Sequence, residues 1–461
     1  MFTTKFQVIM KQLPKLSFWQ IWNLSFGFLG VQFGFALQNA NASRILTSLG
    51  ADPHNLSFFW LVAPIMGLIV QPVVGAASDK TWTRIGRRSP YILGGAIVSM
   101  IAMFFMPNAP MVVKAGGASV LFFGVAMLAL MDGSFNVTFQ PFRALVADMT
   151  PEEQRNLGYS VQSFLINAGA VIGSALPFIL PLLGVSNVPE AGKVAPSVIW
   201  SFYVGGSLLL VSVLVTVIKT KEYPPAEFEA YKNITQEDKE KKEGFFTLLK
   251  NMPSTMRQLA VVQLFSWFPF FLLWVYATTA ISQHYYGVAI DFNAEAASKA
   301  ELANYNNAGD WVNLCFAIYS LAAALFSIAI PKLINLTNRK TVYAASLLSG
   351  GLGLLSMYLF EDKNMLIVSM IGIGISWAGI LAMPYTILSG AIPAKRIGIY
   401  MGLFNLTVVI PQILSGVFGG PILKKIFDGN GIYIMVLAGA IMLLGAISVF
   451  FVNTKTQEQS L

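Results

Sequence analysis

The sequence has few charged residues, few histidines and a single cysteine. Of its 461 residues 11% are charged, and it contains two histidines and one cysteine, Cys315. A soluble domain carries about 25% charged residues, so this chain cannot cover a water-facing surface of its size. One cysteine cannot form an intrachain disulfide. The composition therefore excludes a soluble enzyme, a disordered protein and a secreted disulfide scaffold.

Long apolar runs take the place of charge. Hydrophobic residues make up 55% of the chain, and the mean hydropathy is +0.64. A membrane-spanning helix needs about 20 mostly apolar residues. Such runs are too long and too continuously apolar for the alternating strands of a β-barrel. We therefore predict an all-α polytopic membrane protein. Its twelve transmembrane helices are expected at residues 18–40, 57–78, 91–108, 118–142, 158–184, 197–218, 259–282, 311–331, 341–360, 365–389, 398–422 and 432–452.

The distribution of Lys and Arg predicts the orientation of these helices. With the N-terminus placed inside, 23 of the 30 Lys and Arg residues lie in inside segments. This excess is typical of cytoplasmic loops, so we predict that both termini are cytoplasmic, in a plasma membrane or bacterial inner membrane. The net charge of +8 then belongs to loops, and no nucleic-acid partner is expected. The first 16 residues contain no small-residue cleavage site, so we expect no cleavable signal peptide.

A polar segment divides the chain into two halves. Residues 1–220 hold six predicted helices, residues 221–258 form a charged cytoplasmic linker, and residues 259–461 hold the other six. This layout is found in transporters built from two parallel repeats, which bind their substrate near the middle of the membrane between the repeats. We expect a monomer, the default state for such a bundle.

One acidic residue is predicted to lie deep in the membrane. Asp132 lies about fourteen residues into its helix, or roughly 21 Å along the axis, whereas we place the other acidic residues in loops or at helix ends. Ionisable groups at such depth are costly and usually functional, and burial favours the protonated carboxyl. Asn136, Gln140 and Arg143 share the same helical face, with Arg143 too distant for direct contact in a regular helix. We interpret this face as an ion-coupling and solute-binding surface. A structural carboxylate that ties two helices together is the alternative.

Amide and aromatic side chains are further candidates for contacts with a solute. Amides donate and accept hydrogen bonds, which suits a hydroxyl-rich neutral ligand, although interhelical bonding also uses them. The helix at 259–282 carries an aromatic stripe on which a sugar ring could stack. Packing against lipid is the alternative. Besides Asn136 and Gln140, the candidate substrate contacts are Gln32, Gln38, Asn39, Trp267, Trp274, Trp377, Asn405 and Gln412.

The loop between the second and third predicted helices concentrates charge. Asp79 ends one helix, and Arg84, Arg87 and Arg88 precede the next. Opposite charges here can pair across helices and stabilise one conformation, so we interpret this segment as a cytoplasmic gating loop. A solvated anchoring loop is the alternative.

The sequence contains no recognisable catalytic set. Both histidines, His54 and His284, fall near the predicted outer face, and Cys315 has no nearby base. No metal-ligand cluster or phosphate-binding loop is present. We therefore expect neither an enzyme nor a bound metal or cofactor.

Several motifs resemble those of known transporters. Gly75-x-x-Ser-Asp-Lys followed by Gly86-Arg-Arg resembles the helix 2–3 signature of the major facilitator superfamily. The longer string from Ser78 to Ile92 is similar to that of sucrose–proton symporters and their bacterial and animal relatives. The chain also resembles this group in segments 30–38, 132–148 and 405–412. The resemblance therefore spans nearly the whole chain.

The resemblance implies the major facilitator fold and transport of a disaccharide together with protons. It implies that Asp132 is the protonation site and Arg143 an essential partner, and it places His54 near the outer mouth. The chain differs from the plant relatives after Trp267-Phe-Pro-Phe, where it has neutral residues in place of acidic ones. Arg44 is a further difference, and we also assign it to the outer mouth.

We therefore predict proton-coupled symport of a disaccharide or α-glucoside, of the sucrose or maltose type, by alternating access. The expected partners are the sugar, protons and the lipid bilayer. Two alternatives stay open. One is a carrier of the same fold for another solute, such as a sodium-coupled glycoside, a lipid or a drug. The other is a non-transporting membrane sensor.

Overall fold

The computed structural model describes residues 13–113, 118–190, 192–232, 252–389 and 403–453. Regular structure in these ranges is helical, apart from one isolated bridge between Thr83 and Gly86. The helices before the linker are α1 (Phe18–Ser25), α2 (Gly27–Ser48), α3 (Leu56–Trp60), α4 (Val62–Lys80), α5 (Ser89–Phe105), α6 (Ala109–Val112), α7 (Ala118–Met149), α8 (Arg155–Leu182), α9 (Pro196–Lys219) and α10 (Pro225–Lys232). Those after it are α13 (Ser254–Tyr286), α14 (Lys299–Leu336), α15 (Arg339–Leu359), α16 (Leu366–Ser389), α18 (Leu406–Lys425) and α19 (Gly431–Ser448).

The lengths and composition of these helices fit a membrane protein. Ten helical segments in the described ranges are long and apolar enough to cross a membrane, and Ser89–Phe105 is a shorter apolar helix. The helices α1 and α2, which meet at Phe26, supply a further segment of comparable length. The predictions of an all-α chain and of about twelve spanning segments are therefore confirmed.

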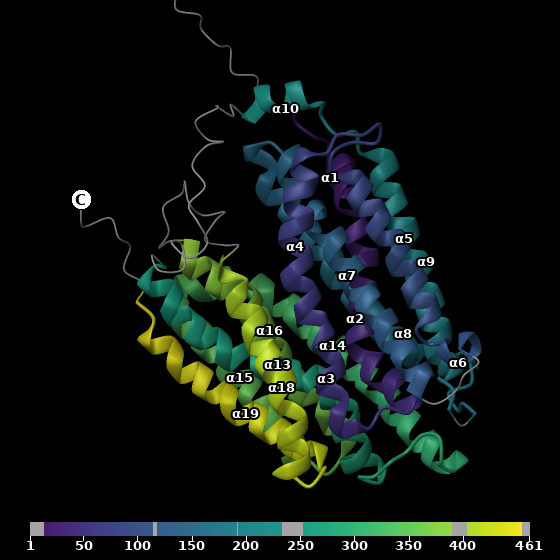
Figure 1. Cartoon of the computed structure of the whole chain (residues 1–461). Helices are drawn as coiled ribbons and strands as arrows, with labels where there is room; N and C mark the ends of the chain where they lie inside the picture. The colour runs from purple at the N-terminus through teal and green to yellow at the C-terminus, as the bar shows by residue number, and fades with distance from the viewer. Residues whose placement is uncertain (1–12, 114–117, 191, 233–251, 390–402, 454–461) are drawn as a thin grey trace, which may run out of the picture.

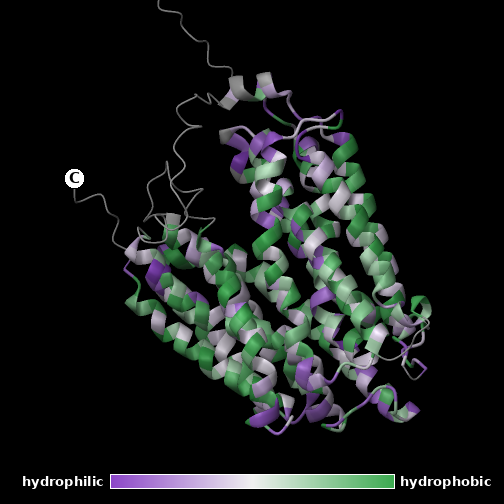
Figure 2. Cartoon of the chain, viewed as in Figure 1, coloured by the Kyte–Doolittle hydropathy of each residue, from purple (hydrophilic) through white to green (hydrophobic). Residues whose placement is uncertain are grey.

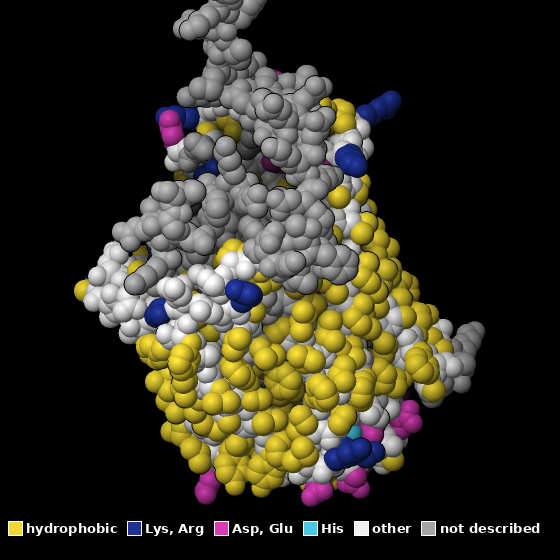
Figure 3. Space-filling view, turned by 60° about the vertical axis from the view of Figure 1, so that its left-hand side comes forward, with side chains coloured by type: hydrophobic (Ala, Val, Ile, Leu, Met, Phe, Trp, Pro, Cys, Tyr) yellow, Lys and Arg dark blue, Asp and Glu magenta, His cyan; other side chains and the backbone are white. Residues whose placement is uncertain are grey.

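Hydrophobic side chains form a belt around the molecule. Figure 2 shows that apolar residues dominate the middle of the helices, while hydrophilic residues gather towards their ends. On the face seen in Figure 3, a continuous hydrophobic band separates the charged side chains of the two ends. This surface is suited to contact with lipid acyl chains.

The helices pack as two groups. On one side α2, α5, α7, α8 and α9 pack against one another, with α4 against α7, and on the other side α15, α16 and α19 pack together, with α13 against α19. The helices α14 and α18 belong to this second group through contacts with α16 and α13, and α14 also contacts α8 of the first group. The predicted domain limits remain a prediction, since residues 233–251 of the linker lie outside the described ranges.

Several predicted helix boundaries were wrong by more than one turn, and two of them concern a contact between helices. The first helix continues to Ser48 instead of ending at residue 40, and α14 begins at Lys299 instead of at residue 311. Ser298 forms a capping box with Glu301 at the start of α14. Both missed stretches are polar, and their side chains bond to one another across the two helices, so hydropathy alone does not mark the helix ends.

Exposure along α2 shows where the two groups of helices separate. From Gly27 to Asn39 the helix is buried except at Leu29, Gln32, Phe35 and Asn39, a spacing of three or four that marks one face. Residues 40–48 are all buried. In Figure 1 the ribbons of the two groups likewise lie close at the lower end and diverge towards the end that carries α1 and α10. We call these the closed end and the open end.

Candidate functional site

Asp132 lies inside the first group of helices and is surrounded by amides. It belongs to α7 and is 4% exposed. Its Oδ1 accepts a hydrogen bond of 2.9 Å from Nε2 of Gln38, and its Oδ2 lies 3.5 Å from Nδ2 of Asn136. That amide also donates to the Asp132 carbonyl oxygen at 2.9 Å. Within the described ranges no Lys, Arg or His forms an ion pair with Asp132, so its known partners are neutral.

Gln71 extends this cluster across the two groups of helices. Its Nε2 donates to Oδ1 of Asn136 at 2.6 Å, while its Oε1 accepts from Gln140 at 2.8 Å and from Asn405 at 3.3 Å. Asn405 precedes α18, so the chain of bonds joins α2, α7 and α4 to the second group. Sequence reasoning missed Gln71. The signal that could have found it is an amide within a predicted span, directly before Pro72.

Three of the predicted amides have no hydrogen-bond partner among the described residues. Gln32 and Asn39 lie on the partly exposed face of α2, and Gln412 of α18 is also partly exposed. Their side-chain donors and acceptors are therefore unused within the described ranges.

The three predicted tryptophans come together in the second group of helices. The Trp377 ring of α16 lies 5.5 Å from the rings of both Trp267 and Trp274 of α13, and Phe270 completes the cluster at 4.9 Å from Trp377. The indole Nε1 of Trp267 is buried without a hydrogen-bond partner. An indole nitrogen only donates, so this cluster contains an unused donor, while Trp267 and Trp274 are only 8% and 9% exposed.

Arg143 lies apart from Asp132. Its side chain is exposed, and its guanidinium carbon lies 5.0 Å from the centre of the Phe139 ring. It forms no ion pair with any described carboxylate. Its role as a partner of Asp132 therefore stays a prediction, and any coupling between the two would have to act through a change of conformation.

The predicted gating loop is built from ion pairs. Arg88 binds Asp79 at 2.6 Å and Asp148 at 3.3 Å, and Arg87 binds Asp148 at 2.5 Å. These contacts connect α4, the 81–88 loop and the end of α7. Arg84 is exposed and has no partner among the described residues. The ion pairs all lie within the first group of helices, and their gating role stays a prediction.

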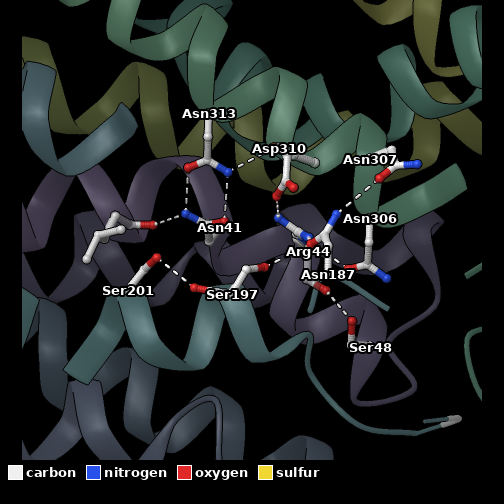
Figure 4. A network of polar contacts seen from close by, with 12 residues as sticks. Asn41, Arg44, Ser48, Asn187, Ser197, Ser201, Asn306, Asn307, Asp310 and Asn313 are labelled. Carbon is white, nitrogen blue, oxygen red and sulfur yellow. Dashed lines mark hydrogen bonds and ion pairs between the residues drawn. The ribbon is translucent and has the colours of Figure 1, made fainter. Parts of the chain in front are cut away.

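The residues assigned to the outer mouth lie at the closed end. His54 contacts Asp52 through Nδ1 at 2.6 Å, and its backbone lies against Gly420 of α18. Arg44 is fully buried, and its Nη1 lies 2.7 Å from Oδ1 of Asp310 (Figure 4). The prediction that Asp132 is the one acidic residue deep in a helix was therefore wrong, because Asp310 lies inside α14 and is 6% exposed.

Within the described part of the chain, no group of three or more His, Cys, Asp or Glu side chains could hold a metal ion. The candidate site instead consists of one buried carboxylate, neutral amides and aromatic rings, a set suited to a proton and a hydroxyl-rich solute.

Comparison with known families decides the class of protein. The family described as MFS/sugar transport protein matches residues 45–391, which is more than half of the chain. The chain belongs to this family. The expected relationship to the major facilitator superfamily is thereby confirmed, and the protein is a membrane transporter and not an enzyme.

The proteins to which this chain is similar in sequence include plant and yeast transporters. The chain is 26% identical over 338 residues to the general alpha-glucoside permease of Schizosaccharomyces pombe, covering 70% of this chain and 58% of the permease. It is 24% identical over 474 residues to sucrose transport protein SUC4 of Arabidopsis thaliana, covering 93% and 89% of the two chains.

Solved structures confirm the fold of this family member. The crystal structure of the D-xylose–proton symporter superposes with a TM-score of 0.66 at 14% identity, covering 95% of this chain and 100% of that one. The nucleoside transporter NupG (D323A mutant) gives the same TM-score at 14% identity, covering 94% and 99%. At such low identity the likeness establishes the fold alone.

Proposed function

We propose that this protein is a proton-coupled symporter of a disaccharide or α-glucoside that works by alternating access. The observation that carries the proposal is the environment of Asp132, a buried carboxylate whose described partners are neutral amides. Relatives named as sucrose and alpha-glucoside transporters support the choice of sugar.

The contacts of Asp132 suit a group that gains and loses a proton. A buried carboxylate without a cationic partner is costly when charged, and protonation removes that cost. Gln38 donates to the carboxylate through Nε2, while its Oε1 is buried without a partner. Rotation of this amide would present Oε1 to a protonated carboxyl as an acceptor. The same pair of side chains can therefore satisfy both protonation states.

The proposed sugar site lies between the amides and the tryptophans. Asn136, Gln140, Gln71 and Asn405 offer donors and acceptors at the junction of the two groups of helices. The partly exposed amides are Gln32 and Asn39 of α2 and Gln412 of α18. The tryptophan cluster of α13 and α16 offers ring faces. Sugar hydroxyls would exchange with the amide–amide bonds, and those bonds would reform after release.

The coupling of sugar to proton transport follows from the free-energy cost of burying a charged Asp132. A carrier with a charged, unpaired Asp132 is disfavoured in any state that closes this region from water, so an unloaded or half-loaded carrier changes conformation slowly. With the open end cytoplasmic, as the positive charge of the loops favours, the structure corresponds to an inward-facing state. The proposed location is a plasma membrane or bacterial inner membrane, with both termini cytoplasmic and the protein monomeric.

Asp132→Asn provides the test. We expect purified Asp132→Asn in liposomes to exchange external for internal labelled sugar at a rate near that of the wild type, but to lose sugar accumulation driven by a proton gradient. Sucrose and maltose are the sugars to screen, in sodium-free buffer. Asp291→Asn, which alters an exposed loop carboxylate, is the matched control and should accumulate sugar normally.

Accumulation by Asp132→Asn at the wild-type level would contradict the proposed role of this residue. If the wild type accumulates sugar only with sodium, and the proton gradient has no effect, the result would instead support the sodium-coupled alternative.

A further inference from the structure

A buried ion pair joins the two groups of helices at the closed end. The side chains of Arg44 of α2 and Asp310 of α14 are 1% and 8% exposed, and they meet at 2.7 Å. The other donors of Arg44 are also used: Nε binds Oδ1 of Asn306 at 3.0 Å, and Nη2 binds Oδ1 of Asn187 at 2.7 Å (Figure 4). The guanidinium is therefore held by an acceptor set from both groups.

A pair of amides continues this polar contact one turn closer to the middle of the molecule. Asn41 and Asn313 exchange two hydrogen bonds, of 2.8 and 2.9 Å. Because Asn41 and Arg44 meet Asn313 and Asp310 in opposite order, α2 and α14 run antiparallel here. Gly309 allows the close approach, since a Cβ at this position would lie 2.6 Å from Cδ of Arg44. We call Asn41, Arg44, Asp310 and Asn313 the polar seam.

The chemistry of the polar seam determines the free energy needed to open the closed end to water. When two buried charges separate into water, they regain hydration, and this offsets much of the lost attraction. An apolar contact of the same size would instead expose hydrophobic surface, at about 25 cal/mol per Å². A charged contact is therefore easier to open to water than an apolar one, provided that both charges are present.

We propose that Arg44 and Asp310 are positioning residues for transport, which close the outer end in the inward-facing state and separate into water when that end opens. The proposal rests on the proposed alternating access. It assigns the pair a conformational role that neither the sugar nor the proton site supplies.

Removal of one charge and removal of both charges should have opposite effects on the opening of the closed end. Arg44→Met or Asp310→Asn leaves an unpaired charge that is costly when buried, and the protein can hydrate that charge by opening the closed end. Arg44→Met combined with Asp310→Leu leaves an apolar contact, which should keep the end shut. Arg44→Lys retains the charge and should behave nearly as the wild type.

Cysteine labelling of purified full-length protein in detergent measures this opening. Ser57→Cys, in a Cys315→Ser background, is the reporter, because Ser57 is fully buried at a separate contact between the groups, where its Oγ accepts from the Gly420 N–H. We expect a water-soluble maleimide to label the reporter about tenfold faster in each single-charge variant, which corresponds to about 1.4 kcal/mol. The apolar double variant should be labelled more slowly than the wild type.

Two controls separate opening from unfolding and from general charge effects. Ser201→Cys reports on a position buried within the first group of helices, and should stay unlabelled in every folded variant. Lys193→Met and Glu190→Gln break an exposed ion pair within one loop, and should leave the labelling of Ser57→Cys unchanged.

Equal labelling of the wild type and the single-charge variants would overturn the proposal, as would an apolar double variant that is labelled as fast as the single ones. If the single variants fail to fold, the apolar double variant, which has no unpaired charge, still decides. The assay uses no sugar, so failure of the seam proposal is distinguishable from the absence of sugar transport.

Discussion

At the scale of single residues, the buried carboxylates of Asp132 and Asp310 have different surroundings. Asp310 faces a guanidinium, whereas the described partners of Asp132 are the amides of Gln38 and Asn136. A paired carboxylate keeps its charge because the partner stabilises it, while a carboxylate held by amides can lose its charge without leaving a cation unpaired. We therefore propose that Asp132 couples protons to transport and that Asp310 takes part in closing the outer end.

Gln71 is predicted to matter for sugar affinity more than for coupling. Gln71→Leu removes partly buried bonds to Asn136, Gln140 and Asn405, and a typical intramolecular hydrogen bond contributes about 1 kcal/mol. We expect KM for sugar uptake to rise about fivefold or more while accumulation stays proton-dependent, as measured by initial uptake rates. Asn167→Leu, which loses one exposed bond within its own helix, is the control. An unchanged KM in Gln71→Leu would remove Gln71 from the site.

The residues that sequence reasoning found or missed differ in their surroundings. Asp132 is surrounded by apolar sequence, so its depth is evident from the chain alone. Asp310 lies in a polar stretch with Asn306 and Asn307, which hydropathy places outside the membrane span. Its burial depends on Arg44, 266 residues away in sequence, and no local pattern encodes that contact.

At the scale of helices, α5 depends on a residue outside itself. No side chain of its own caps its first turn. The Glu222 carboxylate instead accepts hydrogen bonds from the N–H groups of Arg87, Arg88 and Ser89 and from the Ser89 hydroxyl. Gly86, with φ +123°, brings the backbone close, since a Cβ there would overlap the Glu222 side chain. The 81–88 loop is thereby fixed to the segment that follows α9.

We predict that Glu222→Ala destabilises the first group of helices. The lost bonds resemble the loss of a helix N-cap with its favourable charge, about 1–2 kcal/mol. The measurement is the midpoint of thermal unfolding of the purified protein in detergent, which should fall relative to the wild type. Glu361→Ala, at an exposed turn position, should leave the midpoint unchanged. An equal midpoint in both variants would contradict the capping role.

Helix ends show the limit of hydropathy. The twelve apolar stretches locate the spanning segments well, but the polar ends of α2 and α14 extend far beyond them, because their amides and charges bond to each other. The Glu222 cap likewise depends on tertiary contact between residues 133 or more apart in sequence. Patterns of period 3.6 report on one helix and its apolar face, and carry little information on such partners.

At the scale of the whole molecule, the two groups of helices touch at the closed end and separate towards the open end. A disulfide across the closed end should therefore trap this arrangement. A Cβ at Gly419 would lie 3.4 Å from Cβ of Ser57, which is close to the spacing in disulfides. We expect Ser57→Cys with Gly419→Cys to lose sugar uptake on oxidation and to regain it on reduction.

Each single cysteine variant, treated with the same oxidant, is the control for this crosslink and should keep its uptake. Full uptake by the oxidised double variant, with the crosslink confirmed by mass spectrometry, would show that the closed end need not open during transport.

In the proposed mechanism a sugar and protons cross the membrane together, with Asp132 binding and releasing the proton. The most direct measurement is the external pH of sodium-free liposomes containing the purified protein, recorded as sucrose, maltose or a related glucoside is added. We expect at least one sugar to make the external medium more alkaline, as protons enter with it, and Asp132→Asn to abolish this change. Sugar uptake by the wild type without any change in pH would contradict proton coupling.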